Sequence, residues 1–355
     1  MKKKVLVAMS GGVDSSVAAL LVKEAGHDAT GVTMKLYDND TIGSYAKTCC
    51  SLENINDAKS VAKSLGIPFE VCDFRPEFEE KVISEFTSAY EHGITPNPCV
   101  DCNRTLKFDE LFRAGKELGQ DYIATGHYVI VEHGEDGRYK LRKAVDLSKD
   151  QSYVLYSLSQ EQLSHTMFPL GSMHKSETRK IAEAHGFISA KRKESQDICF
   201  IPDGDYASFI ERYTGKKIAS GNFVDMDGNI LGIHKGIIHY TVGQRKGLGL
   251  ALKYPMYVQY IDAQNNEVVL GSNEDLFKTE LTAHNFNWVS IACPDATFRA
   301  KARIRYKHKE APATITPISE TEVKIVFDEP QRAITKGQSV VVYDGDYVVG
   351  GGKIV

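Results

Sequence analysis

Residues 10–15 read SGGVDS, and they join a short apolar run at residues 5–9 to a longer periodic run at residues 13–25. This order predicts a β-strand that turns directly into a helix. The first N–H groups of such a helix lack intrahelical partners and carry the positive end of its dipole, so they attract anions, phosphate above all. The two glycines let the backbone approach a ligand closely, and the two serines add hydroxyl donors. The stretch therefore predicts a phosphate-binding loop.

Asp14 is the unusual member of this loop, because a carboxylate does not bind phosphate directly. We expect it either to cap the helix or to hold a Mg²⁺ ion that bridges the phosphates of a nucleotide. The loop lacks the G-K-[ST] of a Walker loop and the G-x-G-x-x-G of a dinucleotide-binding turn. A bare S-G-G fits a tight strand-to-helix turn with capping serines equally well. The complete string at the end of the first strand favours phosphate.

The composition is that of a globular protein of a reducing compartment. A chain of 355 residues predicts two or three domains, and 42% hydrophobic and 25% charged residues are ordinary values. A net charge of −4 excludes a generally basic nucleic-acid binder, so any basic surface must be local. Seven cysteines scattered over the chain argue against a disulfide framework. No run approaches the ~20 apolar residues of a membrane span, and the first apolar stretch is too short for a signal peptide. We therefore expect a cytoplasmic protein without a membrane partner.

The first half of the chain alternates strands with helices. The expected strands cover residues 5–9, 29–36, 69–72 and 122–125, and the expected helices cover residues 13–25, 54–65, 76–91 and 104–118. Repeated strand–helix units predict an α/β class with a doubly wound parallel sheet, which binds ligands beyond the carboxyl ends of its strands. The phosphate loop, Met34 and the pair Gly126–His127 all follow such ends. We expect these three stretches to converge on one crevice.

Three domains are predicted. Residues 1–204 form the doubly wound domain, and a hairpin over residues 128–143 is expected to be appended to its sheet, followed by helices near 160–165 and 175–185. Residues 205–278 form a small central α+β, strand-rich domain. Residues 279–355 consist almost entirely of short predicted strands, which indicates a C-terminal β-barrel.

One stretch of the last domain carries like charges at alternate positions. It reads FRAKARIRYKHK from Phe298, and its cationic residues are Arg299, Lys301, Arg303, Arg305, Lys307 and Lys309. Alternate residues of a strand share a face, so we expect one cationic face. The opposite face, expected to pack toward a core, carries Ala300, Ala302, Ile304 and Tyr306. Because like charges repel, the pattern favours RNA or DNA as a partner over a face that contacts only solvent. Residues 241–250, TVGQRKGLGL, are a weaker second candidate.

Two cysteines lie in settings that favour a reactive thiolate. Cys102 follows the proline-rich loop at residues 96–99, and we expect a helix to start near Asn103 or Arg104, which places this thiol at a helix N-terminus. Cys199 lies downstream of three cationic residues, Lys191, Arg192 and Lys193.

The other cysteines give weaker signals. Cys99 and Cys102 form a C-x-x-C, but no second C-x-x-C or H-x₃-H completes a zinc site. Cys72 and Cys293 are expected to be packing residues, and the pair at residues 49–50 has no assigned role. A phosphate loop combined with two separated, activatable thiols suggests that ATP activates a substrate, which a thiol or persulfide then attacks.

Five motifs in fixed order carry a resemblance. After SGGVDS come NPCVDCN at residues 97–103, ATGHY at 124–128, KDQSY at 149–153 and ESQDICFI at 194–201. With these, the chain resembles from end to end the MnmA family of tRNA-specific 2-thiouridylases, which belong to the ATP pyrophosphatases (PP-loop superfamily). The resemblance implies an adenine nucleotide α-hydrolase-like fold and a C-terminal barrel that contacts tRNA.

The resemblance also implies a reaction, 2-thiolation of the wobble uridine of the tRNAs for Lys, Glu and Gln. ATP with Mg²⁺ adenylates O2 of that uridine and releases diphosphate. Cys199 carries a persulfide received from a sulfur-relay protein or a cysteine desulfurase, and its terminal sulfur goes to C2 as AMP leaves. Cys102 is the catalytic partner, and a Cys102–Cys199 disulfide forms as the reaction completes. The base must leave the anticodon stack for a pocket.

Binding residues follow from the same resemblance. Those implied to bind ATP are Ala8, Met9, Ser10, Gly11, Gly12, Val13, Asp14, Ser15, Met34 and Gly126. Those implied to contact the target base are Asn97, Pro98 and Cys99. Those implied to contact or recognise tRNA are His127, Lys149, Asp150, Gln151, Arg305, Tyr306 and Gln338.

One position departs from the family pattern. Some relatives carry Asp where this chain has Cys99, and that carboxylate is assigned an acid–base role in them. Cys99 does not do the same work without a shifted pKa, and Asp101 is the nearby carboxylate. The resemblance therefore does not carry a general base over to this chain.

Three alternatives stay open at this point. Cys99, Cys102 and Cys199 could hold an iron–sulfur cluster with one open iron that binds sulfide. A second alternative keeps the phosphate loop but uses an amine as the nucleophile, which requires no thiol pair. The third is a non-catalytic RNA-binding module that uses the basic strand and treats ATP as a structural ligand.

Overall fold

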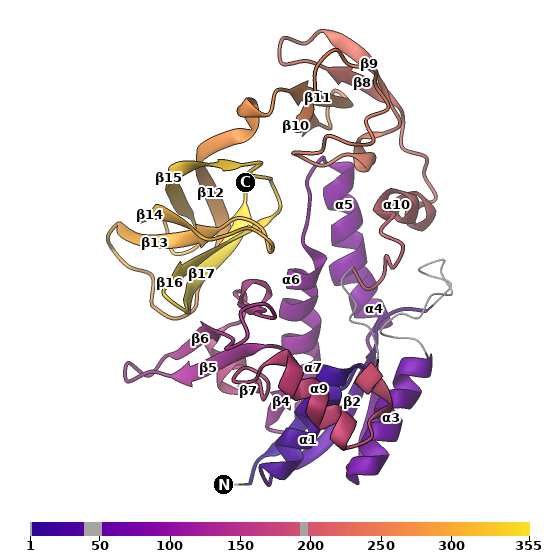
Figure 1. The fold of residues 1–355 in the computed structure, drawn as a ribbon, viewed down its shortest axis with the longest axis vertical. Helices are drawn as coiled ribbons and strands as arrows, with labels where there is room; N and C mark the ends of the chain where they lie inside the picture. The colour runs from indigo at the N-terminus through magenta and orange to yellow at the C-terminus, as the bar shows by residue number, and fades with distance from the viewer. Residues whose placement is uncertain (1, 39–51, 192–197) are drawn as a thin grey trace.

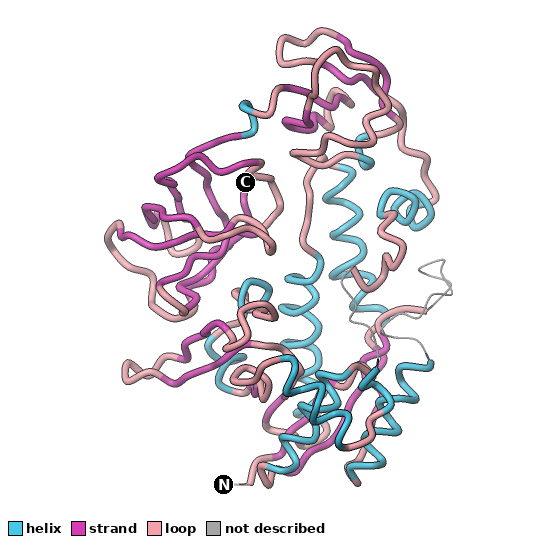
Figure 2. Tube along the Cα trace, in the orientation of Figure 1, coloured by secondary structure: helices cyan, strands magenta, loops and turns pink. Residues whose placement is uncertain are grey.

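The structure is a computed structural model of the 355-residue chain that describes residues 2–38, 52–191 and 198–355 (Figure 1). Helices gather in the first part of the chain and strands dominate the second (Figure 2). Three sheets divide the molecule: a parallel sheet, a small mixed sheet and a barrel. Among the described residues, no helix is long and apolar enough to span a membrane.

The parallel sheet confirms the predicted α/β class. Its five strands run in the order β3-β2-β1-β4-β7. Their bounds are β1 (Lys4–Ala8), β2 (Asp28–Lys35), β3 (Phe69–Asp73), β4 (Tyr122–Ala124) and β7 (Thr166–Met167), and all pairings are parallel. The chain proceeds outward from β1 to β3 on one side and then resumes at β4 on the other. The strand order therefore reverses beside β1, where doubly wound sheets bind their ligands.

Helices cover both faces of this sheet because the side chains of β1 alternate. Val5 and Val7 pack into one core cluster with α1 (Val13–Glu24), α3 (Leu52–Leu65) and α9 (Lys175–Ala184). Leu6 points to the other face and packs with the helical segment of residues 98–117. That segment consists of α6 (Pro98–Cys102), η2 (Asn103–Glu110) and α7 (Leu111–Glu117). A second long helical segment consists of α4 (Arg75–Phe78), η1 (Glu79–Ser84) and α5 (Glu85–Glu91).

Shorter elements complete the first part of the chain. They are η3 (Ser152–Val154), α8 (Gln160–Ser164) and η4 (Ile188–Lys191). The predicted helices near 160–165 and 175–185 correspond to α8 and α9, and are confirmed. Ser159 caps α8 by accepting a hydrogen bond from the backbone of Gln162, which explains why the helix starts there.

The central sheet has four strands in the order β10-β11-β8-β9. They are β8 (Gly221–Val224), β9 (Ile230–His234), β10 (Tyr257–Asp262) and β11 (Glu267–Gly271), and the pair β11–β8 is parallel. The helix α10 (Tyr206–Thr214) and the short turns η5 (Ile237–His239) and η6 (Glu274–Leu276) flank this sheet. The domain boundaries predicted at residues 204/205 and 278/279 stay predictions.

The last part of the chain forms the predicted barrel. Six strands follow one another in the order β12-β15-β14-β13-β16-β17, and β12 also pairs with β17, which closes the sheet. They are β12 (Phe277–Trp288), β13 (Phe298–Arg303), β14 (Ala311–Pro317), β15 (Val323–Arg332), β16 (Ser339–Asp344) and β17 (Tyr347–Ile354). Valine, isoleucine and phenylalanine side chains such as Ile315, Ile325 and Phe327 fill the interior.

The hairpin was predicted to extend the parallel sheet, and this prediction is wrong. β5 (Val129–His133) and β6 (Tyr139–Lys143) pair with each other, and β6 continues the barrel sheet beside β17 through Arg142 and Tyr347. Tyr347 donates a hydrogen bond to Glu132 (2.7 Å). The edge of the parallel sheet beside β4 is instead taken by β7. The first domain therefore contributes two strands to the sheet of the last.

We predict that Phe200→Ala lowers the free energy of unfolding by about 3–5 kcal/mol, because it empties a fully packed aromatic site. The ring of Phe200 is 1% exposed and contacts the rings of Phe78, Phe86 and Phe209 at centroid distances of 5.6, 5.4 and 5.2 Å. Chemical denaturation followed by circular dichroism measures the loss. Phe277→Ala is the control, because this ring is 43% exposed. Equal losses in both variants would contradict the packing argument.

Candidate active site

The phosphate loop lies between β1 and α1 and is shaped by its glycines. Gly12 occupies the N-cap position of α1 and has no side chain to cap it. Gly11 has a φ of 72°, and a Cβ there would lie 2.5 Å from the carbonyl oxygen of Asn54, so torsion and space both require glycine. The N–H of Ser10 donates to Oγ of Ser15 (3.1 Å), whose hydroxyl donates to the Gly12 carbonyl (3.1 Å). These hydrogen bonds hold the loop in shape. The N-terminus of α1 has no side-chain cap at the N-cap position.

Asp14 forms an ion pair instead of capping the helix. Nζ of Lys175 lies 2.6 and 2.7 Å from its two carboxylate oxygens. The hydroxyl of Tyr128 donates to the same carboxylate (2.8 Å) and lies 2.9 Å from Oγ1 of Thr178. The capping alternative for Asp14 is therefore wrong, since the N-cap has no side-chain hydrogen bond. The Mg²⁺ alternative is compatible with this position.

The partners of Asp14 were missed by sequence reasoning. Lys175 is the first residue of α9, 161 positions away, and its side chain is only 10% exposed. His174 precedes it as the N-cap, and the backbone N–H of His174 donates to Glu177 (2.7 Å), which sets the start of the helix. Locally this stretch carries only the signal of a helix start. Nothing in its sequence points to the phosphate loop.

Gly126 packs directly against the loop. A Cβ at this position would lie 2.8 Å from the carbonyl carbon of Asp14 and 2.8 Å from the backbone nitrogen of Ser15. Met34 lies half-buried near the carboxyl end of β2, which neighbours β1. The expectation that these stretches meet at the carboxyl edge of the sheet is confirmed for Gly126 and the loop. Binding of ATP by these residues stays a prediction.

His127 lies inside the protein. It is 9% exposed, its Nδ1 is 2.8 Å from Oγ1 of Thr125, and its ring packs against Phe108 and Phe168. Burial holds the pKa of His127 well below its usual value, so the ring is neutral at pH 7. Its predicted part in tRNA recognition can therefore act only through its neighbours in this conformation.

The helix after the proline-rich loop starts earlier than predicted. α6 begins at Pro98, a residue favoured in the first turn of helices because it has no N–H to leave unpaired. Asn97 precedes it as the N-cap, and the exposed Cys99 lies in the first turn. Cys102 is the last residue of α6, and the helical path continues beyond it through η2. The prediction that Cys102 stands at the helix N-terminus is thus wrong.

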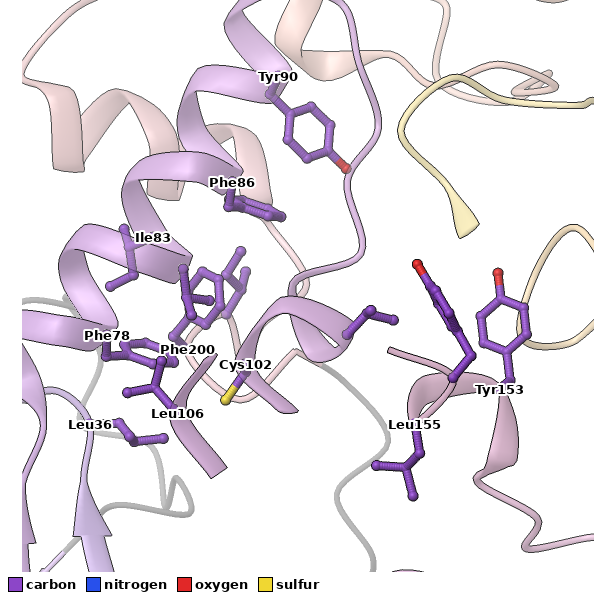
Figure 3. Close-up of a cluster of buried hydrophobic side chains, with 14 of the residues drawn as sticks. Leu36, Phe78, Ile83, Phe86, Tyr90, Cys102, Leu106, Tyr153, Leu155 and Phe200 are labelled. Atoms are coloured by element: carbon purple, nitrogen blue, oxygen red, sulfur yellow. The ribbon is translucent and has the colours of Figure 1, made fainter. Parts of the chain in front are cut away.

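Cys102 and Cys199 border the same core. Cys102 is 8% exposed and belongs to the cluster that contains Leu36, Leu106 and Phe200, as Figure 3 shows. Cys199 is half-buried and packs against this cluster. Its carbonyl oxygen accepts a hydrogen bond from Tyr37 (2.8 Å), which anchors the chain beside the thiol.

The surroundings of Cys199 are only partly described. Arg192 and Lys193, which were expected to favour its thiolate, lie outside the described residues, as do Cys49 and Cys50. Among residues 2–38, 52–191 and 198–355, no three His, Cys, Asp or Glu side chains form a group that could hold a metal ion.

The segment KDQSY uses its polar side chains to hold the fold. Asp150 is buried and accepts hydrogen bonds from the backbone of Ala144 (3.1 Å) and the hydroxyl of Ser152 (2.7 Å). Oε1 of Gln151 accepts one from the backbone of Tyr128 (2.9 Å), next to the phosphate loop. Lys149 lies beside them in a turn. Contact of this segment with tRNA stays a prediction.

Arg305 is largely buried between the central domain and the barrel. Its Nη2 donates to the carbonyls of Val242 (3.2 Å) and Ala333 (3.4 Å) and to Oγ1 of Thr335 (2.6 Å). Burial lowers the pKa of Arg305, although a guanidinium stays charged at any physiological pH. The adjacent Tyr306 donates to the carbonyl of Asp150 (3.2 Å). Both residues, predicted to contact tRNA, hold parts of the protein together here.

The long basic strand does not exist as predicted. β13 ends at Arg303, and the chain then turns, so alternate positions share a face only up to that residue. Arg299 pairs with Asp328 (Nη1–Oδ1, 2.7 Å) across the barrel surface. Ala302 and Ile304 are buried as expected, but Tyr306 is 40% exposed and does not face the core. The exposed cations of the stretch are Arg299, Lys301, Lys307 and Lys309.

Family models match the chain in three consecutive parts. Residues 3–203 match a tRNA methyl transferase HUP domain, residues 207–272 a tRNA methyl transferase PRC-barrel domain, and residues 278–354 an aminomethyltransferase β-barrel domain.

Several curated relatives match the entire chain. A protein of Clostridioides difficile named tRNA-specific 2-thiouridylase MnmA is 53% identical over 355 residues, which cover 100% of this chain and 98% of the relative. A protein of Acetivibrio thermocellus with the same name is 52% identical and covers 99% of both chains.

Two solved structures each match 60% of the chain, and distantly. A 4-thiouridine synthetase–RNA complex with bound ATP has a TM-score of 0.38 and 16% identity over 60% of this chain and 50% of its own. The U34-tRNA thiolase NcsA from Methanococcus maripaludis with its [4Fe-4S] cluster has a TM-score of 0.36 and 18% identity, covering 60% and 71%. These likenesses are too weak to support an argument about the site.

We predict that Gly126→Ala weakens ATP binding roughly 5- to 150-fold, the effect of 1–3 kcal/mol of overpacking. The new methyl group would press on the backbone of Asp14 and Ser15 and displace the phosphate loop. Isothermal titration calorimetry with ATP measures the change. Gly115→Ala is the matched control, because its Cβ would meet side-chain atoms alone, the end of Leu6 at 3.3 Å and Cβ of Gln120 at 3.9 Å. An unchanged affinity in Gly126→Ala would show that ATP does not use this loop.

Proposed function

The chain belongs to the MnmA family of tRNA-specific 2-thiouridylases, and from this premise we propose that it replaces O2 of the wobble uridine of tRNA by sulfur at the expense of ATP. The proposed tRNAs are those for Lys, Glu and Gln. The observation that supports a single catalytic centre is the shared core of its parts. Tyr37, just after β2 of the sheet that carries the phosphate loop, donates a hydrogen bond to the carbonyl of Cys199 (2.8 Å), and its neighbour Leu36 lies in the same cluster as Cys102.

ATP binds, in this proposal, with its phosphates at the N-terminus of α1. The glycines of the loop let the phosphates approach the backbone. Gly126 packs against the backbone of Asp14 and Ser15 and so supports the loop. The donors are fixed before the nucleotide arrives, so they stabilise charge that develops on the phosphate without reorganising. Ala8, Met9, Val13 and Met34 line this edge of the sheet, as proposed for the nucleotide site.

Mg²⁺ fits the carboxylate of Asp14. This ion commonly binds through one or two carboxylates together with substrate phosphates, and Asp14 is the acidic residue of the loop. Bound there, it would supply neutralisation of the phosphate charge. Lys175 balances the charge of Asp14 in the structure (Nζ–Oδ1, 2.6 Å), and its ammonium would add a second positive charge for the phosphates.

The chemistry needs ATP because C2 of uridine is a poor electrophile. O2 attacks the α-phosphate, diphosphate leaves, and the oxygen becomes part of a good leaving group. The terminal sulfur of the Cys199 persulfide then attacks C2, and AMP leaves with the oxygen. Finally, the Cys102 thiolate attacks the inner sulfur of Cys199, which forms a Cys102–Cys199 disulfide and releases 2-thiouridine. The persulfide comes from a sulfur-relay protein or a cysteine desulfurase, and a thiol reductant restores the cysteines.

Asp101 is not placed to replace the acid–base carboxylate that some relatives carry at the position of Cys99. Its Oδ1 lies 2.9 Å from Nζ of Lys353 in the last strand of the barrel. Cys102, the next residue, belongs instead to the hydrophobic core cluster. A proton acceptor for this reaction is therefore not assigned to Asp101.

We predict that Lys175→Met weakens ATP binding roughly 10- to 150-fold, because it removes a charged hydrogen-bond partner worth about 1.5–3 kcal/mol and leaves Asp14 to repel the phosphates. Calorimetric titration with Mg-ATP measures the affinity. Lys180→Met is the matched control, since Lys180 lies exposed on the same helix. An equal loss in the control, or no loss in Lys175→Met, would contradict the proposed role of this ion pair.

We predict that Cys199→Ala abolishes 2-thiouridine formation, with a loss on the order of 10³-fold or more, while diphosphate release continues. Unmodified tRNA is incubated with the protein, Mg-ATP and a sulfur source, and its nucleosides are analysed by mass spectrometry. Cys293→Ala is the control, because Cys293 lies in the barrel part of the chain. Thiolation by Cys199→Ala at the wild-type rate would refute the persulfide mechanism.

The same preparation separates the remaining alternatives. Brown colour of anaerobically purified protein, lost in Cys102→Ala, would favour an iron–sulfur cluster. Full activity of Cys199→Ser would favour an amine nucleophile. A protein that binds tRNA but releases no diphosphate in its presence would be a binding module. Each of these outcomes would replace the proposed mechanism.

A further inference from the structure

The stretch at residues 94–102, named here the target-base loop, consists of residues 94–97, which lie outside any helix or strand, and of α6. Pro96 and Pro98 have no N–H groups, and each forces the preceding residue out of the helical region. Asn97 accordingly has φ −118° and ψ 89°. The N–H of Thr95 donates outside the loop, to the carbonyl of Lys336 in the barrel (3.1 Å). Residues 94–97 therefore depend on contacts with the residues that surround them.

Gln338 supplies the first external support. Its Nε2 donates to the carbonyl oxygens of Thr95 (3.0 Å) and Pro96 (3.2 Å), directly before Asn97. An amide nitrogen carries two hydrogens, and these two carbonyls use both. Gln338 lies immediately before β16, in the turn that follows β15.

The turn between β15 and β16 packs its backbone at Gly337 directly against the target-base loop. Gly337 has a φ of 85°, and a Cβ there would lie 2.2 Å from Cγ2 of Ile94 and 3.0 Å from the carbonyl oxygen of Thr95. Glycine is required at this position for torsion and for space. The loop and the barrel therefore contact each other at a position where only glycine fits.

Lys353 supplies the second support, at the other end of the loop. Its Nζ lies 2.9 Å from Oδ1 of Asp101, whose side chain is 8% exposed, and Nη2 of Arg104 lies 3.8 Å from the same oxygen. Lys353 pairs in register with Ser339, the residue after Gln338, so adjacent strands present both supports together. Burying a carboxylate is costly unless it is paired, so the ion pair with Lys353 favours this placement of Asp101.

We propose that Gln338 and Lys353 form a two-point clamp that positions the target-base loop for sulfur transfer. The inference rests on the proposed function, in which Asn97, Pro98 and Cys99 hold the flipped base and Cys102 takes part in the chemistry. Both residues are positioning residues that act through the loop. Gln338, predicted from family resemblance to aid tRNA recognition, acts by holding two carbonyls in place. The barrel thereby completes the catalytic centre as well as offering a surface to tRNA.

The test compares Gln338→Glu, Lys353→Met and the double variant with Gln331→Glu and Lys324→Met. The controls change the same residue types on another part of the barrel, where Gln331 donates to Glu329 and Lys324 pairs with Glu280. We expect kcat for thiolation to fall roughly 10- to 100-fold in each clamp variant, the cost of a misplacement of about 1 Å. The KM for tRNA should stay within about twofold, and the controls should match the wild type.

A second readout needs neither tRNA nor ATP. We expect the clamp variants to react several-fold faster with N-ethylmaleimide at the buried Cys102, measured by peptide mass spectrometry, because a released loop exposes this thiol. Lys353→Met keeps the test decisive if Gln338→Glu unfolds the barrel, since the Lys353 side chain is 40% exposed. Faster labelling in a protein that does not thiolate tRNA would support the clamp while refuting the proposed function. A raised KM with unchanged kcat, or unchanged labelling, would overturn the clamp.

Discussion

The ion pair between Asp14 and Lys175 is the contact on which the nucleotide end of the molecule depends. It places a cation against the phosphate loop and joins the first helix of the sheet to the last helix on the same face. Tyr128 donates to the same carboxylate from the chain segment that leaves β4. Three segments far apart in sequence thus meet at one carboxylate, which is partly exposed and is paired with the nearly buried ammonium of Lys175.

The domains are joined by polar contacts of the same kind. Arg305 reaches the carbonyl of Val242 in the central domain from the start of the barrel's turn, and Gln338 reaches the target-base loop. The hairpin β5–β6 adds strands of the first domain to the barrel sheet. Each contact uses main-chain carbonyls or strand edges, whose unmet hydrogen-bonding capacity would be costly in a buried interface. The barrel consequently contacts the segment that leads into α6.

The sequence alone predicted the elements that depend on neighbouring residues in the chain. The strand that turns directly into a helix at residues 4–24, the alternation of strands and helices and the closed barrel follow from periodicity and turn residues, and the structure confirms them. Phosphate binding by the loop stays a prediction. The sequence did not predict contacts between residues that lie far apart in the chain. Lys175 meets Asp14 only after 161 positions, and the hairpin joins the barrel because β7 takes the other edge. The start of α6 was misplaced because two prolines suggested a loop, although a proline in the first turn is compatible with a helix.

The placement of individual cations bears on how a protein with a net negative charge can bind tRNA, a polyanion. The net charge is −4, so attraction for tRNA must come from local groups of cations. Arg299 is balanced by Asp328, and Arg305 donates to carbonyls between two domains, so neither is available as a pure phosphate contact. Lys301, Lys307 and Lys309 remain exposed around the end of β13. In the proposed function, charge near the barrel orients the tRNA, while Asn97, Pro98 and Cys99 receive the base. Such a division suits an enzyme that must extract one base from a stack, since phosphate contacts fix register and carry no information about the base.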